Sequence, residues 1–144
     1  MFYSDKHKVS LADYRVTNVV LLFFPLAFTC GCTTELCNVR VNIATYNNTN
    51  AQVFGISIDS LFVLNKYKAE QNLNFPLLSD FNKEAATAFG VLYDVFPSFG
   101  MQGVSKRAAF VIDKDGVVRY AEICATPGEQ PDYVAIQQTL AGLN

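Results

Sequence analysis

Apolar residues form two continuous runs in the first half of the chain. Residues 18–24 (NVVLLFF) and 51–58 (AQVFGISI) show no regular polar alternation and are rich in β-branched and aromatic side chains. This pattern is typical of buried strands in a parallel sheet that is covered on both faces. Between the runs the apolar period becomes helical, at Leu36, Val39 and Ile43. The pattern therefore predicts a strand, a proline-containing loop and a helix that starts near Cys32.

Helical and extended patterns alternate through the middle of the chain. Residues 60–71 predict a helix that Asp59 or Ser60 would cap. The predicted buried face of this helix consists of Leu61, Leu64 and Lys68 or Ala69. The segment NFPLLSD then predicts an extended piece, and NKEAATAFG predicts a short helix that Gly90 ends.

A hairpin and a closing helix are predicted in the last third of the chain. Residues 108–113 and 117–123 flank DKDG, which is a hairpin turn signal. Residues 131–140 predict a helix with Pro131 placed early and Gly142 past its end. The buried face of this helix is expected to contain Tyr133, Ile136 and Leu140. Strands that alternate with helices, followed by a hairpin and a helix, predict an α/β sandwich with a mixed central sheet.

Composition and charge narrow the class of protein. The chain has 144 residues, 51% of them hydrophobic, and a formal net charge of −2. We expect one domain, residues 1–144, because a chain of this length can bury a sufficient core. The sequence contains no basic run, which disfavours nucleic acid as a partner. The apolar run from Val19 to Phe28 is too short to span a bilayer, so we expect a cytoplasmic protein without a membrane partner.

The same apolar run loosely resembles a signal peptide, because basic residues precede it and Cys30 follows it. Asp5 and Asp13 dilute the basic end, and Pro25 interrupts the run. Bulky Phe28 lies close before Cys30, where a processing site needs small residues. A lipid-anchored or exported metal-binding protein is therefore an alternative hypothesis. It predicts cleavage near Cys30, which an intact-mass measurement would detect.

Three of the four cysteines, Cys30, Cys32 and Cys37, lie within eight residues. Their spacing has no second half-site and the only histidine is His7, so neither a metal centre nor a Cys–His protease is expected. The C-x-x-C motif of the usual dithiol oxidoreductases is also absent from the sequence. Cys30 and Cys124 are expected to be buried packing residues. At the predicted helix start, the free backbone N–H groups would favour a thiolate at Cys32.

The frame P-x-x-x-T-x-x-C, formed by Pro25, Thr29 and Cys32, resembles the peroxidatic motif of the peroxiredoxins. Other segments are similar to the family in the same order: VSLADYR, NVVLLFFPLAFT, VFGISIDS, NFPLLSDFNKEAATAFGV and KRAAFVIDKDGVVRYAEI. FFPLAFT and the tail AEICATPGEQPD are most similar to the alkyl hydroperoxide reductase E type. The spacing from Cys32 to Cys37 is that of the peroxiredoxin Q (bacterioferritin comigratory protein) type. The resemblance covers nearly the whole chain.

This resemblance implies a thioredoxin-like three-layer sandwich and an enzyme that reduces hydrogen peroxide and organic hydroperoxides without a metal or cofactor. Cys32 would attack the O–O bond and become a sulfenic acid. Thr29 and Arg107 would bind the peroxide, and Arg107 would also bond to the thiolate. Pro25 would shield the thiolate. Glu35, expected in the first turn of the helix, would hold the guanidinium of Arg107 in place.

Cys37 is the candidate resolving cysteine. Five helical residues rise about 7.5 Å, whereas a disulfide needs Cα atoms within about 7 Å, so the helix start would have to unwind. If Cys37 is only a packing residue, an external thiol resolves the oxidised Cys32. The resemblance implies thioredoxin or a glutaredoxin-like protein as the reductant. A non-catalytic thioredoxin-fold redox sensor or chaperone is the alternative function, and steady-state peroxide turnover distinguishes it.

The N-terminal region departs from the pattern of the family. Family members usually carry a further strand before a Pro-Asp-Phe segment, and this chain begins about there, at Met1 and Phe2. Edge packing and dimer contacts depend on that strand, so either a monomer or a homodimer is expected.

Overall fold

The computed structural model describes residues 2–3, 8–14, 16–97 and 99–143. Within these residues, six strands form one sheet in the order β1-β4-β3-β2-β5-β6. The strands are β1 (Phe2–Tyr3), β2 (Asn18–Phe23), β3 (Ala51–Ser57), β4 (Leu77–Ser79), β5 (Ala108–Ile112) and β6 (Val118–Ile123). Strands β2, β3 and β4 are parallel, whereas β1, β5 and β6 pair antiparallel with their neighbours. The predicted mixed central sheet is therefore confirmed.

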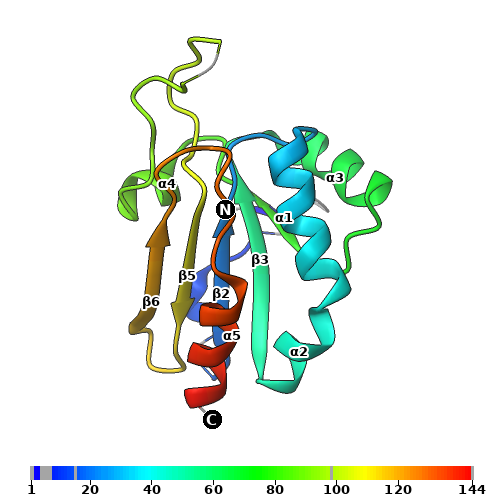
Figure 1. The fold of residues 1–144 in the computed structure, drawn as a ribbon, viewed down its shortest axis with the longest axis vertical. Helices are drawn as coiled ribbons and strands as arrows, with labels where there is room; N and C mark the ends of the chain where they lie inside the picture. The colour runs from blue at the N-terminus through cyan, green and yellow to red at the C-terminus, as the bar shows by residue number, and fades with distance from the viewer. Residues whose placement is uncertain (1, 4–7, 15, 98, 144) are drawn as a thin grey trace.

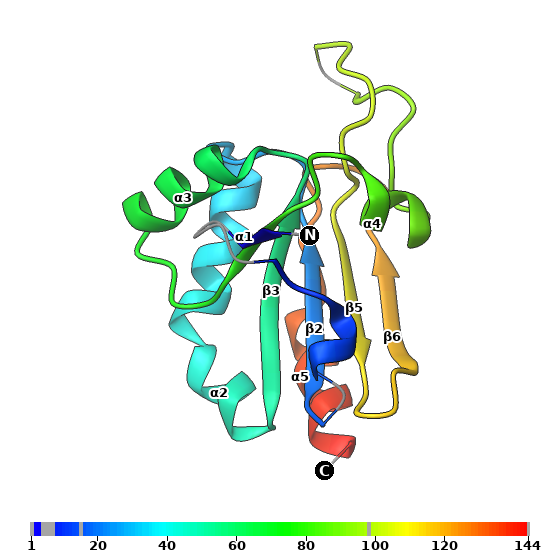
Figure 2. The ribbon, with the colours of Figure 1, turned by 180° about the vertical axis from the view of Figure 1, so that it is seen from behind.

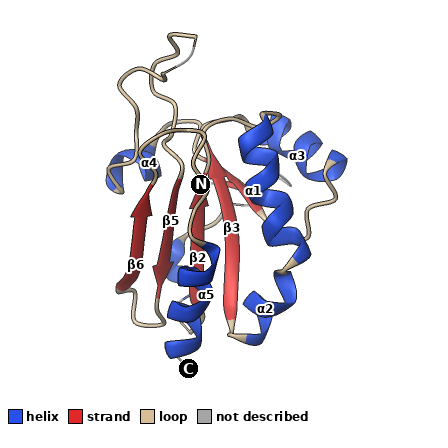
Figure 3. Cartoon of the chain, in the orientation of Figure 1, coloured by secondary structure: helices blue, strands red, loops and turns tan. Residues whose placement is uncertain are grey.

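Helices cover both faces of the sheet. They are η1 (Leu11–Tyr14, a 3-10 helix), α1 (Cys30–Val41), α2 (Ile43–Asn48), α3 (Leu61–Glu70), α4 (Glu84–Ala88) and α5 (Tyr133–Gly142). Figure 1 shows α1, α2 and α5 in front of the sheet, and Figure 2 shows η1 and α4 over the opposite face. The sheet is thus the middle of three layers (Figure 3). No helix in the described part of the chain is long and apolar enough to cross a membrane.

Strand β2 is buried along its whole length, as its apolar run predicts. Val20 and Leu22 belong to the core that α1 and α5 cover, whereas Val19 and Leu21 belong to the core on the side of η1 and α4. Successive strand residues point to opposite faces, so a strand covered on both faces is apolar at every position. Each buried aliphatic side chain contributes about 1.5–3 kcal/mol, and β2 therefore anchors both helical layers.

Helix α1 starts earlier than predicted, at Cys30 rather than near Cys32. Phe28 has a left-handed φ of 67° and Thr29 is extended, with φ −101° and ψ 151°. These two residues turn the chain so that the helix begins directly after Thr29. Cys32 is consequently the third helical residue, within the first turn. Glu35 lies in the second turn, so the prediction that it occupies the first turn is wrong.

Helix α1 also ends earlier than predicted. It stops at Val41, and Ile43 belongs to the separate helix α2. The break lies at Asn42, whose Nδ2 donates a hydrogen bond of 2.8 Å to the Asn38 carbonyl. An asparagine side chain that bonds to a nearby carbonyl offers the backbone an alternative to the regular helical ladder. One predicted helix therefore becomes two.

Ser60 caps α3 as predicted, because its Oγ accepts a hydrogen bond from a backbone N–H of the first turn at 3.3 Å. The buried face of α3 differs from the prediction. Leu64 is buried, but Tyr67 is the second buried residue, and Lys68 and Ala69 are not buried. The Tyr67 ring fills the core beneath α1, which leaves the charged residues of α3 in water.

Helix α5 begins at Tyr133 rather than at Pro131, because Asp132 is its N-cap and accepts a backbone hydrogen bond at 3.0 Å. The helix runs through Gly142, so this glycine lies inside the helix and not past its end. The expected buried face is confirmed at Ile136 and Leu140. Pro131 therefore belongs to the loop that precedes α5.

The DKDG turn joins β5 to β6, as predicted. Asp113 Oδ1 accepts hydrogen bonds from the backbone N–H groups of Asp115 and Val117, both at 2.9 Å. Gly116 completes the turn with φ 82°, a conformation that glycine adopts without strain. The hairpin brings the end of β6 back beside the start of β5.

The strand register determines which segments meet at one end of the sheet. Phe23, the last residue of β2, pairs with Ala108 at the start of β5, and Ala108 pairs with Ile123 at the end of β6. Three segments therefore converge there: the loop from β2 to α1, the residues before β5, and the loop from β6 to α5.

Candidate functional site

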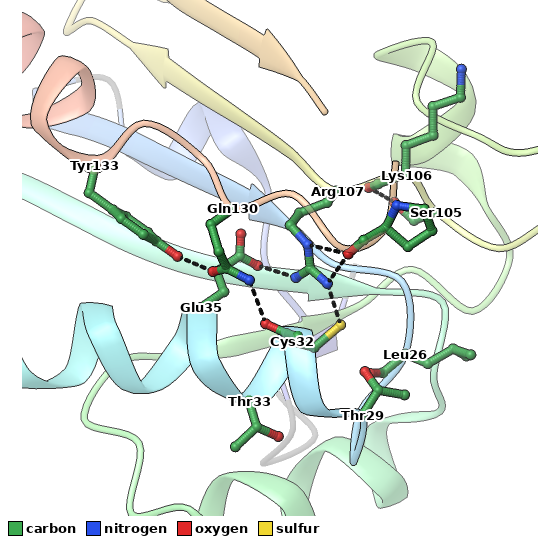
Figure 4. Close-up of polar contacts among 12 residues, drawn as sticks. Leu26, Thr29, Cys32, Thr33, Glu35, Ser105, Lys106, Arg107, Gln130 and Tyr133 are labelled. Atoms are coloured by element: carbon green, nitrogen blue, oxygen red, sulfur yellow. Dashed lines mark hydrogen bonds and ion pairs between the residues drawn. The ribbon is translucent and has the colours of Figure 1, made fainter. Parts of the chain in front are cut away.

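Arg107 lies directly before β5 and contacts two side chains of α1. Its Nη2 donates to Cys32 Sγ at 3.4 Å, and its Nη1 donates to Glu35 Oε1 at 3.3 Å (Figure 4). The exposed fractions of Arg107, Cys32 and Glu35 are only 2%, 1% and 0%. The fold thus brings together three side chains that the sequence analysis singled out separately.

The guanidinium of Arg107 also contacts the loop between β6 and α5. Its Nε and Nη2 donate to the Pro127 carbonyl oxygen at 3.2 and 2.9 Å. The sequence analysis missed this contact, and no residue-type signal could have revealed it, because every residue carries a backbone carbonyl. Three segments of the chain therefore determine the position of one guanidinium group.

Gln130 joins the same loop to the start of α1. Its Nε2 donates to the Gly31 carbonyl at 3.0 Å, and its Oε1 accepts a hydrogen bond from the Tyr133 hydroxyl at 2.5 Å (Figure 4). Sequence reasoning also missed this connection. The only available hint was the similarity of the tail AEICATPGEQPD to one type of peroxiredoxin.

Gly31 is required for the close approach of Arg107 to the helix. A Cβ atom added at Gly31 would lie 2.9 Å from Arg107 Nη2 and 3.6 Å from the Pro127 carbonyl oxygen. The first distance is shorter than a normal van der Waals contact. A glycine before Cys32 therefore leaves the space that the guanidinium occupies.

The loop before α1 carries the other two residues of the motif. Pro25 is buried two residues after the end of β2, and the loop is held where Ala27 N donates to Asp59 Oδ2 at 2.8 Å. Thr29 is exposed at the N-cap position, and its hydroxyl donates to the Leu26 carbonyl at 2.8 Å. A hydroxyl group can rotate and can both donate and accept, so Thr29 can also interact with a group that approaches Cys32.

Burial raises the pKa of the Cys32 thiol above its ordinary value. The positive charge of Arg107 is the largest opposing effect, and the nearby Thr29 hydroxyl and Leu26 backbone oppose the shift further. A charged Glu35 adds to the increase. The net direction is upward, although the free N–H groups of the helix start favour the thiolate. Removal of the sulfur from water outweighs its favourable partners.

Burial also raises the pKa of Glu35, to about 8, although Arg107 lowers it. Glu35 Oε1 accepts from Arg107, but Oε2 has no hydrogen-bond partner among the described residues. An ionised carboxylate with one unpaired oxygen in apolar surroundings is costly. Burial therefore disfavours the charged form of Glu35, and the contact with Arg107 offsets part of this effect.

Cys37 faces away from this cluster. Its thiol is half-buried and lies 3.8 Å from Gln71 Oε1, at the end of α3. Five residues rotate the direction of a helical side chain by about 140°, so Cys32 and Cys37 point to different sides of α1. Both are free thiols, and the intact helix keeps them apart.

Cys124 lies directly after β6 and is buried, as predicted, with 4% of its surface exposed. Burial raises the pKa of this thiol to about 11. His7 and the side chain of Cys30 lie outside the described residues, and so does the prediction that Cys30 is buried. Within the described residues, no group of three or more His, Cys, Asp or Glu side chains is arranged to hold a metal ion.

Known proteins are similar to this chain in sequence and in fold. The model of the AhpC/TSA family matches residues 3–121. Alkyl hydroperoxide reductase E of Mycobacterium tuberculosis is 35% identical over 142 residues, which cover 96% of this chain and 88% of that protein. A mutant of PrxQ from Xylella fastidiosa has a TM-score of 0.87 at 25% identity and covers 98% of this chain and 86% of its own. Peroxidoxin BcpB from Mycobacterium tuberculosis has a TM-score of 0.85 at 28% sequence identity. That match covers 100% of this chain and 92% of the BcpB chain.

The mixed sheet between two helical layers is the thioredoxin-like fold of these structures, as predicted. The chain belongs to the AhpC/TSA family. It is a peroxiredoxin, a thiol peroxidase that reduces hydroperoxides.

Proposed function

We propose that Cys32 is the peroxidatic cysteine. Its thiolate attacks one oxygen of the hydroperoxide, and the O–O bond breaks. The sulfur is oxidised to a sulfenic acid, and the leaving oxygen takes a proton to become water or an alcohol. The contact of 3.4 Å between Cys32 Sγ and Arg107 Nη2, in a buried site, is the observation that carries this proposal.

The other residues of the cluster are assigned supporting roles. Arg107 would hold the thiolate and the peroxide oxygens, and Glu35 would orient its guanidinium through the contact at 3.3 Å. The hydroxyl of Thr29, which is exposed at the N-cap position, would bond to the peroxide. Buried Pro25 would shield the thiolate from water and hold the loop.

Thiol ionisation and stabilisation of the transition state can be compared by the rate increase that each can supply. An ordinary thiol with a pKa of about 8.5 is roughly 3% ionised at neutral pH, so complete ionisation would gain only about 30-fold. Burial raises the pKa of Cys32 and so works against ionisation. The main contribution must be stabilisation of the charge that develops as the O–O bond breaks. Donors that are already oriented, above all Arg107, can supply it.

Substitution of single cysteines tests the assignment. Cys32→Ser should abolish peroxide consumption, whereas Cys124→Ser and Cys30→Ser should retain most of it. The measurement is the loss of hydrogen peroxide or an organic hydroperoxide with a thiol reductant in excess. Substantial turnover by the Cys32→Ser protein would refute the role of Cys32.

Recycling of the oxidised enzyme requires a second thiol. We infer that Cys37 condenses with the sulfenic acid of Cys32, forming a disulfide and releasing water. Because the two residues point to different sides of α1, the start of the helix must unwind first. If Cys37 does not react, an external thiol performs this step. In either case the proposed reductant is thioredoxin or a glutaredoxin-like protein.

The compartment and the substrates of the enzyme are proposed from the same thiol chemistry. Cys32, Cys37 and Cys124 are free thiols, and a reducing compartment such as the cytoplasm would return the enzyme to this state. Both hydrogen peroxide and organic hydroperoxides are proposed substrates, because the thiolate attacks the O–O bond that they share. The proposed assembly is a monomer or a homodimer.

A further inference from the structure

The loop from β6 to α5 forms the wall of the site opposite α1. The Pro127 carbonyl in this loop accepts two hydrogen bonds from Arg107, at 3.2 and 2.9 Å. The loop is itself braced where Asp132 N donates to Glu122 Oε1 at 2.8 Å. The position of the guanidinium therefore depends on how this loop lies against the helix.

One side chain ties the loop directly to α1. Gln130 Nε2 donates to the carbonyl of Gly31, in the first turn of the helix and next to Cys32, at 3.0 Å. The amide of Gln130 is oriented from its other end, because Oε1 accepts from the Tyr133 hydroxyl at 2.5 Å. The chain of contacts thus runs from α5 through the loop to the residue before the peroxidatic cysteine (Figure 4).

We propose that Gln130 is a positioning residue that latches the first turn of α1 against this loop. The inference rests on the proposed functions of Cys32 and Cys37 and extends them. While the latch is closed, Cys32 faces Arg107, and Pro127 supports the guanidinium. When the helix start unwinds to bring Cys32 to Cys37, Gly31 moves with it and the bond to Gln130 must break.

The latch therefore influences the fate of oxidised Cys32. In the closed site the sulfenic acid can react with a second hydroperoxide, which transfers an oxygen atom to sulfur, gives a sulfinic acid and leaves as water or an alcohol. In the unwound state the sulfenic acid instead condenses with the Cys37 thiol and releases water. A weaker latch should favour the disulfide over the sulfinic acid.

Gln130→Met tests the latch, because methionine has a similar length and cannot donate the hydrogen bond. Tyr133→Phe is the second variant, since it keeps Gln130 but removes the hydroxyl that orients it. Gln138→Met is the control, because Gln138 is exposed on α5. The first measurement is amide hydrogen exchange over residues 31–37 of the reduced protein, with exchange elsewhere in the sheet as the internal reference.

Exchange over residues 31–37 should be about fivefold faster in Gln130→Met, the factor that one hydrogen bond contributes. Tyr133→Phe should show a smaller change in the same direction, and Gln138→Met none. Unchanged exchange in both test variants would overturn the proposal. The measurement needs no peroxide, so it tests the latch separately from the role of Cys32, which the loss of turnover in Cys32→Ser tests.

Over-oxidation gives a readout that a purely structural role would not move. Intact mass after titration with peroxide reports the fraction of sulfinic acid. Gln130→Met should need up to about fivefold more peroxide than wild type to reach half over-oxidation, because it unwinds more readily. If peptide mapping finds the Cys32–Cys37 disulfide in wild type, equal thresholds in Gln130→Met and Gln138→Met would show that the contact does not control the helix start.

Discussion

At the scale of single residues, Arg107 distributes its N–H donors over Cys32, Glu35 and the Pro127 carbonyl. A lysine at this position would keep the positive charge but lose the planar fork. We expect Arg107→Lys to slow the oxidation of Cys32 by about 100-fold or more, as for the loss of an oriented oxyanion donor. The measurement is the second-order rate constant with peroxide under rapid mixing.

Arg119→Lys is the matched control for Arg107. Arg119 is half-exposed on β6 and forms an ion pair of 2.6 Å with Asp113, remote from Cys32 in the hairpin. Its replacement should leave the rate constant unchanged. A near wild-type rate constant for Arg107→Lys would place Arg107 outside the reaction, whatever the control shows.

Gly31 supports a second prediction at this scale. Alanine at position 31 would place its Cβ 2.9 Å from Arg107 Nη2, and the guanidinium is held on three sides. We expect Gly31→Ala to displace it by a few tenths of an ångström and to slow Cys32 oxidation by about tenfold, since catalysis is sensitive to small misplacements. The helix propensity of alanine, about 1 kcal/mol more favourable than that of glycine, offsets part of the cost of this contact to folding.

Gly142→Ala is the control for this substitution. Gly142 also lies in a helix, and no atom lies within 4 Å of the position of an added Cβ. The same rate constant should therefore be measured for Gly142→Ala and wild type. If Gly31→Ala also reacted at the wild-type rate, the close approach of Arg107 to the helix would have no catalytic importance.

At the scale of elements, the start of α1 is fastened to α3 as well as to the loop after β6. The Thr33 and Tyr67 hydroxyls are 2.8 Å apart, and the Cys37 thiol contacts Gln71 at 3.8 Å. Unwinding of the helix start breaks these contacts. Two threonines at positions 33 and 34 lower the free-energy cost of unwinding the helix start, because threonine has a modest helix propensity.

Formation of a disulfide between Cys32 and Cys37 should therefore change helix α1 in a measurable way. Oxidation with one equivalent of peroxide should lower the far-UV helix signal and reduce amide protection between these two residues. Cys37→Ser should instead accumulate sulfenic acid and over-oxidise to sulfinic acid in excess peroxide. If wild type and Cys37→Ser over-oxidise equally and peptide mapping finds no disulfide, Cys37 is a packing residue and the enzyme uses one cysteine.

At the scale of the whole molecule, burial of Glu35 makes folding stability depend on pH. The pKa of Glu35 rises from 4.5 to about 8 on folding. Between these values the folded state binds a proton that the unfolded state has lost, so stability falls as the pH rises. The stabilising contribution of protonated Glu35 to folding should be fully present below about pH 4.5 and lost by about pH 8.

Urea denaturation of wild type and Glu35→Gln measures this contribution. Glutamine can still accept from Arg107 but does not titrate. The stability of Glu35→Gln relative to wild type should increase from pH 5 to pH 8 and then level off. A difference that stays constant with pH would mean that Glu35 has a similar pKa in both states.

The sequence by itself determined the parts of this protein that local pattern controls. The continuous apolar run of β2 predicts a strand covered on both faces, DKDG predicts the hairpin, and Ser60 predicts the start of α3. Each of these follows from residues that are close together in the chain. The motif frame likewise singles out Cys32 by the residues just before it.

Only the tertiary structure decided how the site is assembled and which charges it can hold. Arg107 reaches Cys32 across 75 positions because the strand register places the start of β5 beside the end of β2. The Pro127 carbonyl and the Gln130 latch leave no residue-type signature, and the direction of the Cys32 pKa depends on burial. These properties arise from long-range contacts and desolvation, which depend on which segments pack together and not on the order of neighbouring residues.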